Sequence, residues 1–292
     1  MSRDTQTLRD LVASYISEQC NVILRAESQL RTSADVIHLT RVAVRRLRST
    51  LRVFGELVDV PQAGLLEEEL VWFAGLLGQV RDLDVLENRL RAAIADLAPE
   101  LVLGPVESQL RAEIGAQRKP ARETVRVALE GERYQHLLTM LELWRSAPPL
   151  TDGAQAPATK VSTFVKRADN KLRRRLADAV AAEGSAAPGA DQSGADELLH
   201  RARKAGKRHR YAAELAQPVL GAKADKVIAA RKELQEVLGD YQDSVVTAAF
   251  LRAVASKAGD LPGHNGFTYG LLYAHEMDSR RYLAKRLEPF LS

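Results

Sequence analysis

One short segment of this 292-residue sequence carries a histidine and several arginines at helical spacing. Steps of three or four residues separate His38, Arg41, Arg45, Arg48 and Arg52. Because an α-helix turns about 100° per residue, these side chains fall within an arc of roughly 80° on one helix face. Like charges at this spacing repel one another, whereas phosphate oxygens accept charge-assisted, often bidentate hydrogen bonds from arginine. The spacing therefore predicts a stripe that binds a phosphate polyanion.

The same pattern returns in the second half of the chain. Aligned without a gap on the first copy, the second stripe comprises His200, Arg203, Lys207 and Arg210, with Lys204 and Tyr211 at its edge. A solvated basic face does not require the histidine to recur, so the repetition favours ligand contact for both copies. Helical phase places Arg46 and Arg208 off the stripes. Their replacement is therefore expected to weaken binding less than replacement of Arg45 or Lys207.

A second pair of motifs follows the stripes. Leu77-Gly78 with Arg81-Asp82 is matched by Leu238-Gly239 with Gln242-Asp243, displaced by one residue relative to the first match. We expect Arg81 to join the ligand contacts, and Gln242 at the matching position breaks the equivalence. Asp82 and Asp243 are interpreted as supporting residues that each accept hydrogen bonds from a stripe cation, in preference to a metal or general-base role.

Helices must position these residues. Apolar periodicity near 3.6 predicts an all-α protein with four helices in each half, at 5–30, 35–58, 63–97 and 105–146, then 160–183, 196–217, 223–257 and 264–289. Pro120 is expected to break or kink the fourth helix. On the second helix, an apolar face separate from the stripe is predicted to pack in the core, and it comprises Val44, Leu47, Leu51, Phe54 and Val58.

Composition divides the chain and suggests its setting. The Pro- and Gly-rich stretch 147–159 reads as a linker between halves 1–146 and 160–292, and 184–195 reads as a surface loop. Cys20, the single cysteine, is predicted to be a small core residue, which fits a reducing compartment. The N-terminus lacks the apolar centre of a signal peptide and no long apolar run follows, so we expect a cytoplasmic protein with no membrane partner.

These residues resemble the conserved histidine α-helical domain family, CHAD. The motifs that carry the resemblance are His38-x-x-Arg41-x-x-x-Arg45-Arg46-x-Arg48, the segment from Leu77 to Val85, and their copies beginning at His200 and Leu238. The resemblance spans nearly the whole chain. The resemblance implies two four-helix bundles related by a pseudo-twofold, with a basic central groove or pore that binds inorganic polyphosphate. It also implies association with polyphosphate granules, as for some members. Many members carry a fused triphosphate-tunnel domain with catalytic strands, and this sequence shows no strand pattern for one, so we expect binding without enzymatic activity, metal or cofactor.

Two other classes of function stay open on the sequence. A metal-dependent phosphohydrolase or phosphotransferase would use His38, His200, Asp82 and Asp243, but neither stripe histidine has a second ligand one helical turn away. A nucleic-acid-binding protein needs only arginine stripes to contact phosphates, but the stripes offer Tyr211 alone for base stacking. A third basic stretch, with Lys166, Arg167, Lys171 and Arg174, either extends the binding surface or is solvated.

Overall fold

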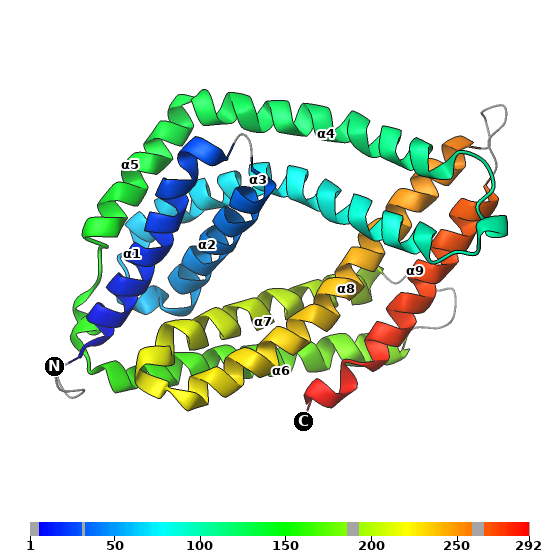
Figure 1. The fold of residues 1–292 in the computed structure, drawn as a ribbon. Helices are drawn as coiled ribbons and strands as arrows, with labels where there is room; N and C mark the ends of the chain where they lie inside the picture. The colour runs from blue at the N-terminus through cyan, green and yellow to red at the C-terminus, as the bar shows by residue number, and fades with distance from the viewer. Residues whose placement is uncertain (1–5, 31–32, 186–192, 259–265, 292) are drawn as a thin grey trace. The chain divides into compact units, whose positions relative to one another are not determined.

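The computed structural model of the chain describes residues 6–30, 33–185, 193–258 and 266–291. Within these ranges the regular elements are all helices, and β-structure is limited to isolated bridges, which confirms the all-α prediction (Figure 1). The α-helices are α1 (Leu8–Ala26), α2 (Ala34–Val53), α3 (Val60–Ala95), α4 (Val106–Glu130), α5 (Glu132–Ser146), α6 (Val161–Ser185), α7 (Ser193–Leu220), α8 (Ala222–Ala258) and α9 (Phe267–Lys285).

The predicted helix at 105–146 is two helices. α4 continues through Pro120, and the break falls at Gly131, the N-cap of α5. A proline inside a helix removes one backbone hydrogen bond and crowds the preceding turn. The helix is buried on both sides of the proline, at Ile114 and Val125, so packing holds it together there. Gly131 is extended, with φ −82° and ψ 157°, and glycine is among the least favourable residues in a helix interior, which is consistent with a break at this position.

The predicted linker, 147–159, is an ordered connection. The backbone amide of Leu8 donates to the carbonyl of Ala156 at 2.9 Å, and the amide of Asp59 donates to the carbonyl of Pro149 at 2.8 Å. Ala154 is fully buried. These contacts tie the segment to α1 and to the start of α3. Most of the predicted loop at 184–195, and the outermost residues of the predicted helices 5–30 and 264–289, lie outside the described residues.

The chain forms two compact units, and each takes residues from both sequence halves. The first unit comprises Met1–Gly78, Glu123–Arg175 and Lys204–Glu233. The second unit comprises Gln79–Arg122, Leu176–Arg203 and Leu234–Ser292. The units therefore do not coincide with the division into 1–146 and 160–292.

In the first unit, α1 packs against α2 and α5, and α1 and α2 run side by side (Figure 1). Ser33 caps α2 by accepting a hydrogen bond from the amide of Val36 at 3.3 Å. The apolar face predicted for α2 is buried at Val44, Leu47, Leu51, Phe54 and Val58, as expected. Because that face enters the core, the arginines of α2 lie on its half-buried and exposed sides.

Cys20 is a buried core residue of α1, as predicted, and burial raises the pKa of its thiol to about 12. The second unit has its own core. It gathers apolar side chains from α3, α4, α8 and α9, namely Leu86, Leu90, Val106, Leu110, Ile114, Leu251, Tyr269 and Leu272.

Candidate anion-binding site

A cavity of about 480 Å³ in the first unit is lined by cationic side chains from three helices. The cations are Arg52 of α2, Arg167 and Lys171 of α6, and Arg208 of α7. Apolar side chains line the rest of the wall, namely Val53, Phe164, Ala168 and Ala205, and Glu67 of α3 is the acid among these lining residues. We call it the cationic cavity. Both copies of the basic repeat, on α2 and on α7, contribute to it.

The cations of this cavity influence one another. Burial lowers the pKa of the Arg208 guanidinium below its ordinary value, and Arg52 and Arg175 lower it further. The pKa of Lys171 is also lowered, by burial first and then by Arg175 and Arg208. A guanidinium stays protonated in spite of such shifts. The arginine contributions to both shifts, which add to that of burial, show that several positive charges are held close together.

Glu67 partly balances this charge. Its carboxylate accepts a hydrogen bond from Nε of Arg52 and lies 3.9 Å from Nη2 of Arg48. Burial lowers the pKa of Arg48, as does Arg52, whereas Glu67 raises it. The Nε atom of Arg48, like that of Arg45 one turn earlier, is buried and has no hydrogen-bond partner. A buried donor left in this state is unfavourable.

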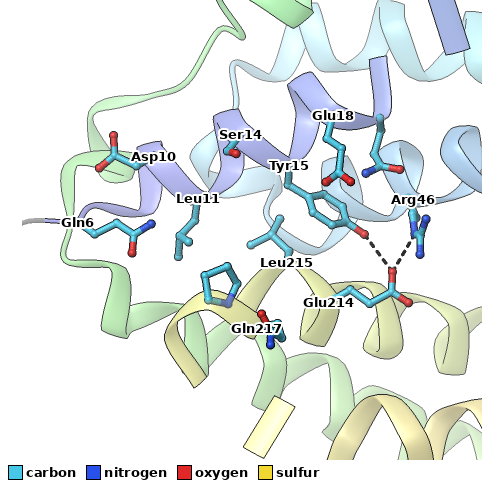
Figure 2. A pocket seen from close by; sticks show the side chains of 12 residues that line it. Gln6, Asp10, Leu11, Ser14, Tyr15, Glu18, Arg46, Glu214, Leu215 and Gln217 are labelled. Carbon is cyan, nitrogen blue, oxygen red and sulfur yellow. Dashed lines mark hydrogen bonds and ion pairs between the residues drawn. The ribbon is translucent and has the colours of Figure 1, made fainter. Parts of the chain in front are cut away.

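A different cluster forms around Glu214 of α7, also in the first unit (Figure 2). Its carboxylate accepts hydrogen bonds from Nε of Arg46 at 2.8 Å, from Nε of Arg210 at 2.9 Å and from the hydroxyl of Tyr15 at 3.3 Å. Burial alone would lower the pKa of Arg46, but Glu214 raises it above the ordinary value. The pKa of Tyr15 is raised by burial and then by Glu214.

Arg46 and Glu214 line a second cavity of about 390 Å³, which we call the acidic cavity. Asp10 and Glu18 of α1 line it too, so its acids outnumber its one lining cation (Figure 2). Asp10 belongs to the N-terminal cap of α1, where its carboxylate accepts a hydrogen bond from the amide of Thr7 at 2.8 Å. An anionic ligand would be repelled here.

The second stripe is therefore not a single ligand face. Arg210 is held by Glu214, four residues later on the same helix. Tyr211 is only 3% exposed, with the guanidinium groups of Arg46 and Arg210 beside its ring. Arg208, which the helical phase placed off the stripe, lines the cationic cavity. It shares this cavity with Arg52 of the first stripe, because α7 presents a different face from α2 to the cavity.

The Leu-Gly motifs have a repeated geometry that explains their match. In the first unit, Nη1 of Arg41 donates to the carbonyl of Leu77 at 3.0 Å, and a Cβ added to Gly78 would meet that Nη1 at 3.4 Å. In the second unit, a Cβ added to Gly239 would meet Nη2 of Arg203 at 3.6 Å. Each stripe arginine thus lies over the glycine of its own copy, which supports the internal repeat.

The second unit holds His200 and its neighbours. Nδ1 of His200 lies 3.1 Å from Oε1 of Gln242, the residue that breaks the equivalence with Arg81. Burial raises the pKa of Asp243, although Arg203 and Arg89 lower it, and Asp82 lies close enough to raise it slightly. Asp243 is thus near the stripe cation Arg203, and its supporting role stays a prediction.

The remaining predicted residues lie on the same helices without entering either cavity. His38, Lys204 and Asp82 are exposed, and Arg81 and Lys207 are half-buried. His38 belongs to the first unit and His200 to the second. Among the described residues, no three histidine, cysteine or acidic side chains gather as they would around a metal ion. Nor is any helix in these ranges long and apolar enough to cross a bilayer.

Sequence reasoning missed four contributors to the cationic cavity: Arg208, Arg167, Lys171 and Glu67. The third basic stretch was visible, but it has no counterpart in the first half, so no pattern assigned it to the site. Glu67 lies outside the basic stretches, 15 residues after Arg52, so no local charge pattern pointed to it. A signal for the Glu214 cluster was present, because Arg210 and Glu214 have the spacing of an intrahelical ion pair.

Comparison with known proteins places this architecture in a family. Residues 14–252 match the CHAD domain. The chain belongs to the CHAD family. Two uncharacterized proteins of Mycobacterium tuberculosis, MT2285 and Rv2226, are each 34% identical to this CHAD chain over 287 residues. The match covers 97% of this chain and 52% of each relative, so the chain spans about half the length of these curated relatives.

Two solved structures share the fold. PptA from Streptomyces chartreusis aligns with a TM-score of 0.79 at 22% identity, covering 97% of this CHAD chain and 100% of its own. The CHAD domain from the plant Ricinus communis aligns with a TM-score of 0.70 at 24% identity, covering 98% of this chain and 93% of the plant domain. At these identities the likeness establishes the all-helical fold.

Proposed function

We propose that this CHAD protein binds inorganic polyphosphate, and that the cationic cavity is a principal contact. The observation that carries the proposal is the convergence of Arg52, Lys171 and Arg208, from three helices, on one cavity with a single lining acid. A chain with one negative charge per phosphoryl group can meet several of these cations at once, so each contact strengthens the next. The link between the CHAD family and polyphosphate supports the same ligand.

The buried arginine donors give a second line of support. The Nε atoms of Arg45 and Arg48 have no hydrogen-bond partner, and both residues belong to the stripe that was predicted to bind phosphate. Phosphate oxygens that reach this side of α2 would accept hydrogen bonds from these two Nε donors, for which the protein itself supplies no acceptor. The wider form of the proposal is a basic groove between two four-helix bundles related by a pseudo-twofold, which takes in both histidine stripes.

The proposal is for binding without turnover, in the cytoplasm, with polyphosphate granules as the cellular partner. A nucleic acid would also be drawn to the cavity by its phosphates, but base stacking needs exposed aromatic faces. Phe164, the aromatic residue of the cavity wall, is 5% exposed, and its ring packs against Phe54 at 4.9 Å. This observation favours polyphosphate over RNA.

Titration calorimetry with polyphosphate of graded chain length, in parallel with RNA of equal charge, tests the proposal. We expect affinity to rise with chain length, to exceed that for RNA, and to fall steeply between low and physiological salt because bound phosphates release counterions. Release of orthophosphate would be monitored in the same samples. A flat salt dependence, or stronger binding of RNA, would contradict polyphosphate binding, and orthophosphate release would contradict binding without turnover.

A further inference from the structure

Glu67 occupies the place where an anionic ligand would be expected to bind. Of the described residues that line the cationic cavity, it is the acid, and its carboxylate already accepts a hydrogen bond from Nε of Arg52. It also lies 3.9 Å from Arg48. About a quarter of the Glu67 side chain is exposed, at 24%, so the carboxylate is accessible from the solvent side.

Two roles are compatible with such a contact, and they predict opposite effects. A carboxylate that holds Arg52 in a rotamer suited to the ligand would strengthen binding. A carboxylate that takes the ligand's place would weaken it, because a phosphate must displace the carboxylate to reach the same Nε donor. Glu67 uses the one Nε–H of Arg52, so a phosphate that binds the Nε edge of this guanidinium must displace the carboxylate.

The surplus of positive charge tells against a purely structural role. Lys171 and Arg208 line the cavity beside Arg52, and neighbouring arginines lower the pKa of both in addition to burial, so one lining carboxylate does not neutralise these charges. An arriving polyanion would therefore find cations to bind first, at Arg208 and Lys171, before it competes for Arg52. A ligand with only one phosphoryl group lacks these additional contacts and cannot offset the loss of the Glu67–Arg52 bond.

We infer that Glu67 is a displaceable internal anion that sets the threshold for ligands of the cationic cavity. It lowers the affinity of the cavity for every anion that must contact Arg52, and it does so by a similar factor for each. Only condensed phosphates, which gain several contacts at once, then bind at moderate concentration, and orthophosphate does not. This inference rests on the proposed function and adds the residue that sets the ligand concentration at which the cationic cavity fills, whereas the preference for linked phosphoryl groups comes from the additional contacts at Arg208 and Lys171.

The test is calorimetric titration of the wild-type chain and of Glu67→Gln with tripolyphosphate and, separately, with orthophosphate. We expect Glu67→Gln to bind both anions roughly tenfold more tightly, the ratio that corresponds to one charge-assisted hydrogen bond regained by the ligand. Glu68→Gln is the matched control, because Glu68 is the exposed neighbour and its replacement removes the same charge. We expect Glu68→Gln to change affinity less than twofold.

A second pair of variants separates displacement from simple repulsion. In an Arg52→Ala background, Glu67→Gln should lose most of its tenfold gain, because Arg52 no longer offers a donor to either anion. Glu67→Asp keeps the charge but shortens the reach to Arg52, and we expect a smaller gain in affinity. This conservative variant also allows the test to proceed if Glu67→Gln fails to fold, which urea denaturation would reveal.

The outcomes distinguish this inference from the proposed function. Weaker binding by Glu67→Gln, or a gain no larger than that of Glu68→Gln, would overturn displacement while leaving polyphosphate binding intact. A gain that persists undiminished without Arg52 would overturn it in favour of repulsion. Tight binding by Glu67→Gln with none by the wild type would support Glu67 as the barrier and refute the proposed function. If neither protein binds tripolyphosphate, both proposals fail.

Discussion

Two clusters in the first unit place a glutamate between two arginines, yet only one of them suits an anionic ligand. Glu67 meets Arg48 and Arg52, and Glu214 meets Arg46 and Arg210. The surroundings of the two glutamates differ. Additional cations lie around Glu67, whereas further acids line the cavity of Glu214 and Tyr15 adds a hydrogen bond to its carboxylate. The local excess of charge, and not the presence of arginine, separates a binding site from a structural ion pair.

Two arginines at matching positions of the repeat show the difference directly. Arg46 and Arg208 occupy the same place in their copies. After burial has lowered both pKa values, Glu214 raises that of Arg46 above its ordinary value, whereas neighbouring arginines lower that of Arg208 further. A repeat can therefore preserve a residue type while the two copies place it in different electrostatic surroundings. Arg46 is paired with Glu214, whereas Arg208 lines the cationic cavity.

The largest expected effect compares arginine pairs from the two clusters. Replacing Arg52 and Arg208 together by alanine removes two cations of the cationic cavity and should weaken polyphosphate binding by roughly 2–5 kcal/mol, allowing for incomplete additivity. Replacing Arg46 and Arg210 removes the same net charge from the Glu214 cluster. We expect that control to weaken binding by less than about 1 kcal/mol, through long-range attraction alone.

Calorimetric titration with one defined polyphosphate chain length measures both double variants. Equal losses would mean that general positive charge, and not the cavity, provides the affinity. Urea denaturation of each variant is needed alongside, because the Arg46 and Arg210 pair also stabilises the fold and a partly unfolded control would mimic a binding defect.

The sequence predicted the helices and the basic repeat well, because both depend on local periodicity. The buried face of α2, including Leu47 and Leu51, followed from a 3.6-residue pattern. The direction in which α7 turns its arginines could not be predicted this way. Arg210 faces Glu214, whose carboxylate also accepts a hydrogen bond from Tyr15, a residue 199 positions away in the sequence that meets it only in the fold.

The cavity was predicted in part for a similar reason. Arg52 was assigned from the helical phase of α2. Arg167 and Lys171 reach the cavity because α6 packs there, and the helical phase of α2 or α7 carries no information about that packing. The contact of Glu67 with Arg52 could not be predicted from the distribution of charge along the sequence. An acid that is 15 residues from Arg52 in sequence is its direct partner in space.

Stability should respond to the two glutamates in different ways. Replacing Glu214 by glutamine leaves Arg46 and Arg210 without their acid partner in a half-buried setting, so we expect the free energy of unfolding to fall by about 1–3 kcal/mol. The Glu67 side chain is more exposed, at 24% against 14%, and its partner Arg52 is 42% exposed. Solvent screening makes such pairs weak, so Glu67→Gln should change stability by less than about 1 kcal/mol.

Urea denaturation at neutral pH, with the slope of the transition compared among variants, distinguishes these two effects. If Glu67→Gln proved as destabilising as Glu214→Gln, Glu67 would be a structural residue and the contrast between the clusters would be lost. A Glu214 variant that unfolds like the wild type would mean that solvent already screens both clusters.

The smallest expected effect concerns His209, the residue between Arg208 and Arg210 on α7. Its side chain is 2% exposed, accepts a hydrogen bond at Nδ1 from Nε of Arg231 at 3.1 Å, and lies 3.3 Å from a carboxylate oxygen of Asp169 on α6. His209 thus contacts α6 and α8 from the turn of α7 that carries Arg208 and Arg210. Burial lowers the pKa of His209 to about 4, and Arg231 lowers it as well, although Asp169 raises it.

In the unfolded chain, His209 takes up its proton near the ordinary histidine pKa of about 6.5, whereas in the fold it does so only near pH 4. Between these values the unfolded chain binds more protons, so stability falls as the pH falls. We expect the wild type to lose about 1–2 kcal/mol between pH 7 and pH 5 through this residue. His209→Gln keeps an acceptor for Arg231 but cannot titrate, so its urea transition should shift less over the same range. The carboxylates are common to both proteins, and the difference between the two curves therefore isolates His209. Parallel curves would show that His209 exchanges protons alike in the folded and unfolded chains, and that burial against α6 and α8 does not hold it neutral.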